Sequence, residues 1–123
     1  MKKLLIAVFI LHVLVEGLVG LLLIVAPAKV VPTQDPALLM FAVNYGFAAV
    51  TMASVVFWTW SQRDNFRTMG VSLGVLATFH TALAMASVQM LAAGGSLAVL
   101  LIHTALAVLF WVLFFNRRQW CVE

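Results

Sequence analysis

Four long apolar stretches occupy almost the whole chain and limit what it can fold into. They cover residues 4–26, 37–60, 69–93 and 97–115. A hydrocarbon core ~30 Å thick is crossed by about 20 apolar residues in a helix, and each stretch is close to or above that length. Backbone groups in lipid must hydrogen-bond within helices or a closed barrel, and no alternation of period two supports a barrel. The sequence therefore predicts an all-α integral membrane protein with four spanning helices.

The segments between these stretches are short, which decides how the helices are arranged. Short connections make consecutive helices antiparallel neighbours, so we expect one transmembrane domain over residues 1–123, a four-helix antiparallel bundle. Pro36 suits the first residue of the second helix, with Asp35 or Thr33 near its cap. Gly94 and Gly95 predict a tight turn, and Ser96 is placed to cap the fourth helix.

Composition excludes a soluble globular domain. Hydrophobic residues make up 65% of the chain and charged residues 9%, and a domain of this size has too much surface for its volume to bury so many. The first apolar run is longer than the core of a signal peptide, so we expect a retained helix. Cys121 is the only cysteine, which excludes an intramolecular disulfide and a metal site built from cysteines.

Basic residues predict the orientation in the membrane. Of the seven Lys and Arg residues, only Lys29 falls in a loop on the predicted external side. The other basic residues are Lys2, Lys3, Arg63, Arg67, Arg117 and Arg118. This positive-inside bias predicts a cell-membrane protein with both termini cytoplasmic, N-in and C-in. The net charge of +3 suits contact with anionic lipid headgroups, and no basic face is left for nucleic acid.

Polar groups at membrane depth are the candidates for function, because ionisable residues there are costly and usually face the interior. The candidates are His12, Glu16, Asn44, Tyr45, His80 and His103. Counted from the external ends, helical rise places His103 and Asn44 ~10–12 Å deep, Glu16 ~15 Å, His80 ~18 Å and His12 ~21 Å. Four helices that bring polar groups to similar depths predict one interior site for a ligand or a proton.

Glu16 and His12 are the strongest pair among these candidates. They are four residues apart and share one helix face, which continues toward Val8, Val19 and Leu23. A carboxylate near the midplane must be paired, hydrated or protonated. For His103, Asn44 and Tyr45 the alternative is structural, because polar side chains often join membrane helices through bonds worth ~0.6 kcal/mol.

Three classes of function are open at this point. The first is a binding or accessory protein whose polar site holds a small apolar or lipid-like ligand or supports a partner subunit. The second is a redox or metal protein: His80 and His103 are the natural pair for haem, although their depths differ by ~8 Å, and His12, Glu16, His80 and His103 could bind a divalent metal. A membrane enzyme using the His/Glu pair as acid and base belongs to this class. No catalytic residue is assigned.

The third class is a proton-coupled transporter in which Glu16 titrates. Glu16 occupies a place similar to the first-helix glutamate of the small multidrug resistance exporters, but their helix 2 and helix 3 patterns are not reproduced. The layout resembles that of DoxX-like four-helix membrane proteins, with Glu-Gly-x-x-Gly from Glu16 to Gly20 followed by a proline-bearing loop. This resemblance implies a membrane or respiratory accessory role.

Two further features bear on access and assembly. Gly70-x-x-x-Gly74 is a helix-association pattern that suits the bundle, a homodimer or a larger membrane complex. Bulky side chains close the cytoplasmic half, including Phe9 and Phe110, whereas the external half carries small ones such as Gly20. We therefore expect a pocket that tapers from the external face toward His12.

Overall fold

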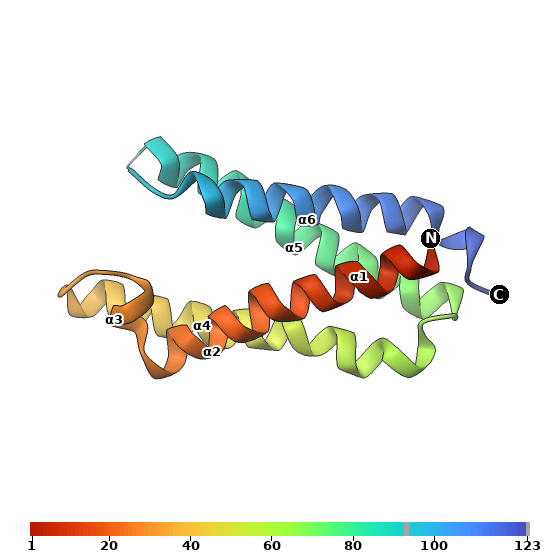
Figure 1. Ribbon diagram of the computed structural model, residues 1–123, viewed down its shortest axis with the longest axis horizontal. Helices are drawn as coiled ribbons and strands as arrows, with labels where there is room; N and C mark the ends of the chain where they lie inside the picture. Colours follow the sequence, from red (N-terminus) through yellow and green to blue (C-terminus); the bar gives the residue numbers. More distant parts are fainter. Residues whose placement is uncertain (93, 123) are drawn as a thin grey trace. The chain divides into compact units, whose positions relative to one another are not determined.

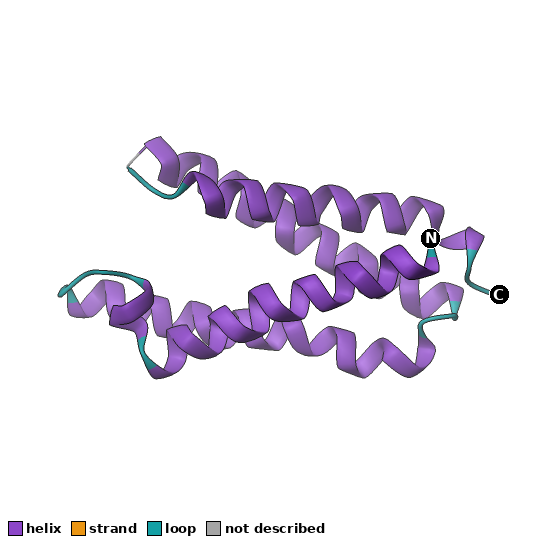
Figure 2. Cartoon of the chain, in the orientation of Figure 1, coloured by secondary structure: helices purple, strands orange, loops and turns teal. Residues whose placement is uncertain are grey.

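The computed structural model describes residues 1–92 and 94–122, and nearly all of them are helical (Figures 1 and 2). The elements are α1 (Lys2–His12), the π-helical turn η1 (Val13–Leu18), α2 (Val19–Val25), α3 (Pro27–Val30), α4 (Pro36–Thr59), η2 (Trp60–Gln62), α5 (Phe66–Ala92), α6 (Leu97–Asn116) and η3 (Arg117–Gln119). Four continuous helical segments are long and apolar enough to cross a membrane: Lys2–Val25, Pro36–Gln62, Phe66–Ala92 and Leu97–Gln119. The protein is therefore a multi-pass membrane protein, and the four predicted spans are confirmed with ends that differ by a few residues. Ala93, the last residue of the third predicted span, lies outside the described residues.

Local chemistry explains where the helices begin and end. Pro36 is the first residue of α4, as predicted, and the Asp35 carboxylate accepts a hydrogen bond of 2.9 Å from the backbone N–H of Ala37. Ser96 occupies the N-cap position of α6, but its side chain makes no cap hydrogen bond. Gly94 has a φ of +87°, which a residue with a side chain adopts only at a cost. The short helix α3 in the first loop was not predicted.

The chain divides into two compact units, which are described separately. Met1–Val8 and Thr59–Glu123 form one, here called the hairpin unit, and Phe9–Trp58 form the other, the crossing unit. Within the hairpin unit, α5 and α6 are antiparallel and lie side by side along their length (Figure 1). Its core is apolar, with Leu73, Leu76, Leu106, Phe110 and Leu113 fully buried. Whether the two units form one bundle stays a prediction.

Three parts of the chain that are far apart in sequence meet at one end of the hairpin unit: the N-terminus, the loop before α5 and the C-terminus. This end is called the loop end below. Lys2 forms an ion pair of 2.8 Å with Asp64 in the loop before α5. The backbone N–H of Val122 donates to the carbonyl of Asp64 at 2.8 Å, and Phe66 donates to the carbonyl of Val122 at 3.1 Å. The guanidinium of Arg117 lies 4.3 Å from the ring centroid of Phe66. The basic segments at both termini and in this loop thus lie together, as the positive-inside pattern requires. The membrane side that they face stays a prediction.

The crossing unit is held by a close approach of two backbones. An added Cβ at Gly46 on α4 would lie 2.7 Å from the carbonyl oxygen of Gly20 on α2, and one at Gly20 would lie 3.0 Å from that of Gly46. Small buried residues continue this face of α4 one turn apart, with Ala42, Ala49 and Ala53. Small residues let membrane helices pack with their backbones close together, so this contact holds α2 against α4.

Candidate functional site

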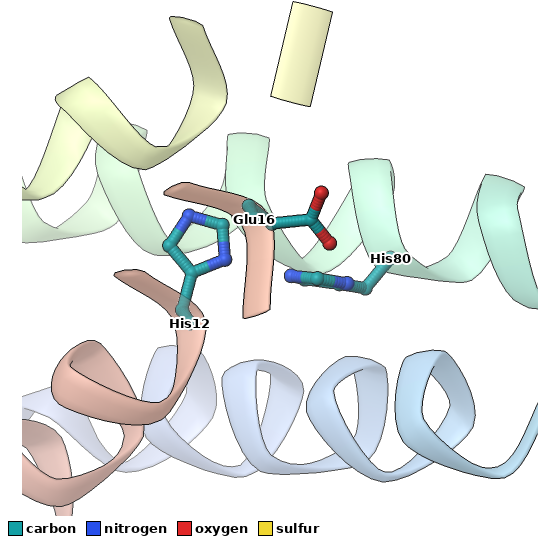
Figure 3. Close-up of side chains that lie close together, drawn as sticks. All are labelled: His12, Glu16 and His80. Carbon is teal, nitrogen blue, oxygen red and sulfur yellow. The ribbon is translucent and has the colours of Figure 1, made fainter. Parts of the chain in front are cut away.

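His12 and Glu16 form a buried His/Glu pair in the first spanning helix (Figure 3). His12 is the last residue of α1, and Glu16 lies in the π-helical turn that follows. Their exposed fractions are 0% and 2%. The metal-ligating atoms of these two side chains lie within 4.8 Å of each other. Both residues of the predicted face are thus buried, and their role in binding a ligand or a proton stays a prediction.

The π-helical turn around Glu16 was not predicted, and it changes which residues lie beyond the pair. A π turn is wider than an α turn, and such turns are found frequently at functional sites. Gly20 and Leu23 are buried after it, whereas Val19 is 40% exposed. The expectation that the face shared by His12 and Glu16 continues to Val19 is therefore wrong, because the wider turn places the residue four positions after Glu16, rather than three, on the inner side.

A backbone contact determines the tautomer of His12. Its Nε2 lies 3.2 Å from the carbonyl oxygen of Met52 on α4. A carbonyl can only accept, so Nε2 carries the proton and donates. In a neutral imidazole the other nitrogen, Nδ1, then has a lone pair. Ligation of a metal by one ring nitrogen while the other donates to a backbone carbonyl is the common arrangement for histidine ligands.

Tyr45 on α4 contacts the carboxylate of this pair. Its hydroxyl donates a hydrogen bond to Glu16. A hydrogen bond of this kind orients the carboxylate and compensates part of the loss of water around it. Asn44, which was expected at the same site, is exposed on another face of α4. The structure therefore brings Tyr45 to the His/Glu pair and does not bring Asn44 there.

A second pair of buried histidines lies between α5 and α6 in the hairpin unit. The Nδ1 atoms of His80 and His103 are 3.1 Å apart, which is a hydrogen-bond distance. The ring of Phe110 stacks on His80 with a centroid distance of 5.5 Å and an interplanar angle of 11°. The predicted depth difference of ~8 Å is wrong as a guide to their separation. It assumed that α5 and α6 end level at the turn, whereas the direct contact of the rings requires a stagger.

This histidine pair does not fit a haem bound between the two rings. Axial ligation needs the porphyrin plane between the ligating nitrogens, with each ring pointing at the iron from its own side. His80 and His103 instead bond to each other directly, and their rings stack with centroids 5.3 Å apart at an angle of 28°. No porphyrin fits between rings in direct contact.

Sequence reasoning missed several partners of these residues. The carbonyl of Met52 carries no signal in the sequence, because every residue has one. Trp111 donates from Nε1 to the hydroxyl of Thr81 at 3.1 Å, one residue from His80. The repeated sequence His-Thr-Ala-Leu-Ala at residues 80–84 and 103–107 was the available signal for the histidine pair, since the two copies place matching residues on helices that pack together.

A pocket of about 510 Å³ lies at the loop end of the hairpin unit. It is lined by Asn65, Phe66, Arg67 and Val122. Neither histidine of the hairpin unit lines it. This pocket therefore does not support the sequence-based expectation of a pocket that tapers from the external face toward His12.

Together the fold and the site define a class: a small multi-pass membrane protein of four apolar helices with a buried His/Glu pair. The chain matches no family model, no curated protein and no solved structure. The resemblance to DoxX-like proteins therefore rests on the topology and on the motif from Glu16 to Gly20.

Proposed function

We propose that this membrane protein binds a divalent transition-metal ion through His12 and Glu16 of the crossing unit (Figure 3). The observation that carries the proposal is the hydrogen bond from His12 Nε2 to the carbonyl of Met52. In the neutral ring, Nδ1 is then the nitrogen that can ligate an ion, and the ligating atoms of His12 and Glu16 lie within 4.8 Å of each other. Imidazole and carboxylate together suit Zn²⁺, Fe²⁺ and Mn²⁺.

The electrostatics of Glu16 support an ion in this place. A buried charge is normally paired or bound to a metal, because transfer of a carboxylate out of water is very unfavourable. Tyr45 supplies one hydrogen bond to this carboxylate. A divalent ion would supply the opposite charge, and the tyrosine hydroxyl would orient the carboxylate as a second-layer partner.

A metal accounts for these contacts better than the other classes of function. A lipid-like ligand requires an apolar cavity beside the polar groups, and neither His12 nor Glu16 lines the pocket of the hairpin unit. Proton transport through Glu16 does not require the His12 tautomer that Met52 sets. A metal site requires both the carboxylate and that tautomer.

The proposal is tested by zinc binding to the purified protein in detergent. After chelator treatment, the native protein should take up one Zn²⁺ per chain, measured by elemental analysis and by competition with a chromophoric chelator. His12→Gln keeps a donor for the Met52 carbonyl but removes the Nδ1 ligand, and Glu16→Gln keeps the shape of the side chain. Each should weaken binding by about 100-fold or more, since loss of an outer partner alone costs about 10–100-fold.

The control is Gln89→Ala, which changes an exposed polar residue of α5 and should bind zinc as the native protein does. Circular dichroism checks that every variant keeps its helices. Native affinity in His12→Gln and Glu16→Gln would overturn the metal site.

A further inference from the structure

The pocket at the loop end of the hairpin unit has three arginines on or beside its lining. Arg67, an exposed residue of α5, lines the pocket directly. Phe66 lines it as well, and its ring centroid lies 4.3 Å from the guanidinium of Arg117 and 5.7 Å from that of Arg118. The pocket therefore lies in a strongly basic part of the unit.

Acidic side chains of the same unit do not balance this charge. Within its described residues, 1–8 and 59–122, Asp64 is the only acid. Its carboxylate is already paired with the Nζ of Lys2 at 2.8 Å. A concave site lined by charge of one sign attracts ligands of the opposite sign, so this pocket favours an anion.

Arg67 is the arginine of this region whose side chain is available to a ligand. Arg117 donates from Nη1 to the carbonyl of Phe114 at 2.6 Å and stacks on that ring at 4.4 Å. Arg63 donates from Nη1 to the carbonyl of Trp60 at 3.0 Å and lies 5.0 Å from its ring centroid. Arg67 forms no side-chain hydrogen bond or ion pair with any residue of 1–92 or 94–122.

The backbone at the start of α5 adds a second donor at the same residue. The first N–H groups of a helix have no partner within the helix. Phe66 donates its N–H to the carbonyl of Val122 at 3.1 Å, and Thr68 donates to Oδ1 of Asn65 at 2.9 Å. The N–H of Arg67, between them, has no partner in the part of the chain that the structure describes. Arg67 thus offers a guanidinium and a backbone N–H to one anion.

We propose that this pocket binds the phosphate of an anionic phospholipid headgroup, with Arg67 as its main ligand. Arginine forms two parallel hydrogen bonds to phosphate oxygens, which makes it well suited to this group. The spanning segment Phe66–Ala92 begins at the pocket, at the level where headgroups lie in a bilayer. The volume of about 510 Å³ is in the range of small-ligand sites. The lipid site is separate from the metal proposed at His12 and Glu16 and does not depend on it.

The test is calorimetric titration of the full-length protein in a non-ionic detergent with short-chain lipids. Dihexanoyl phosphatidylglycerol should bind at one site per chain and about 10-fold or more tightly than dihexanoyl phosphatidylcholine, which has the same chains but no net charge. Inorganic phosphate should bind more weakly than the anionic lipid, because it has no apolar part to bury against Phe66 and Val122.

Two substitutions of the same kind test the role of Arg67. Arg67→Gln should weaken binding of phosphatidylglycerol about 10-fold or more, since it removes a charged hydrogen-bond donor. Arg63→Gln removes the same charge from the same loop region but does not alter the lining of the pocket, and it should bind as the native protein does. Circular dichroism verifies that both variants keep their helices.

Each other result would overturn the proposal. Native affinity in Arg67→Gln would remove the site, and equal losses in Arg67→Gln and Arg63→Gln would show a diffuse effect of charge. Equal binding of the two lipids would exclude selection of an anionic headgroup. Binding of inorganic phosphate as tight as that of the lipid would show that the occupant is free phosphate.

Discussion

The pKa of the Cys121 thiol depends on residues from the loop before α5 and from both ends of the chain, which meet around it. It lies after the last helix as a free, partly buried thiol, and its Sγ lies 3.9 Å from the carbonyl oxygen of Arg63, to which it donates. Burial raises the pKa of the Cys121 thiol, and the nearby charge of Asp64 raises this pKa further, while Arg117 and Lys2 lower it. The thiolate is the reactive form, so the thiol should react slowly near neutral pH.

We predict that Asp64→Asn speeds alkylation of Cys121 severalfold at pH 8. Removal of the negative charge lowers the pKa of the thiol and increases the fraction of thiolate at that pH. The rate is measured with a water-soluble maleimide on the protein in detergent, across a range of pH. Asp35→Asn makes the same charge change in the crossing unit and should leave the rate unchanged. A slower reaction in Asp64→Asn would contradict the assigned effect of Asp64.

At the scale of the helices, the packing against α4 allows a comparison of two glycines, Gly46 and Gly17, by the space available for an added methyl group. A methyl group at Gly46 meets the carbonyl oxygen of Gly20 at 2.7 Å, and backbone cannot move aside without separating the helices. A methyl group at Gly17 meets the Cβ of Ala53 at 3.6 Å and the Cγ1 of Val13 at 3.7 Å, which are ordinary van der Waals contacts. Both substitutions replace a glycine inside a helix, where alanine is favoured by up to about 1 kcal/mol, so the main difference between them is packing.

We predict that Gly46→Ala destabilises the protein by about 1–3 kcal/mol, as overpacking does, whereas Gly17→Ala is neutral or slightly stabilising. The measurement is unfolding followed by circular dichroism as denaturing detergent is added to the protein in mild detergent. Equal stability of the two variants would show that the close approach of Gly20 and Gly46 does not hold the helices together.

The helices also show what could be read from the sequence and what could not. The four spans follow from the length of each apolar run, and the start of α4 follows from Asp35 and Pro36, because these signals are local. The His12–Glu16 face follows from a spacing of four. The π turn around Glu16 has no such local signature, because it depends on how α2 packs against α4 beyond it. As a result, Val19 does not lie on the face that the sequence predicted.

Side-chain pairs across helices were predictable only in part. His80 and His103 were paired by residue type, as candidate haem ligands, but counting rise along each helix could not find their direct bond. Depth along a helix says nothing of the stagger between two helices or of the reach of the side chains. Asn44 and Tyr45 illustrate the same limit: adjacent on one helix, they point about 100° apart, and only packing decides which one meets Glu16.

For the molecule as a whole, the common position of the two termini and the loop before α5 leads to a test of orientation. Lys2, Asp64 and Val122 meet at one end of the hairpin unit. The excess of basic residues there predicts that this end is cytoplasmic. Green fluorescent protein fused after Glu123 should fluoresce, and alkaline phosphatase inserted at Thr33 should be active. Phosphatase activity from a fusion after Glu123 would reverse the orientation.

The discontinuity of the hairpin unit constrains the order in which the protein is made. Chains emerge from the ribosome with the N-terminus first, and contiguous units can pack as they appear. The crossing unit, Phe9–Trp58, is contiguous, so Gly20 can meet Gly46 while α6 is still unsynthesised. The hairpin unit needs both ends of the chain, and His80 must wait for His103. Insertion of the last helix is therefore the step that completes the hairpin unit, and the bond between His80 and His103 forms only when almost the whole chain has been made.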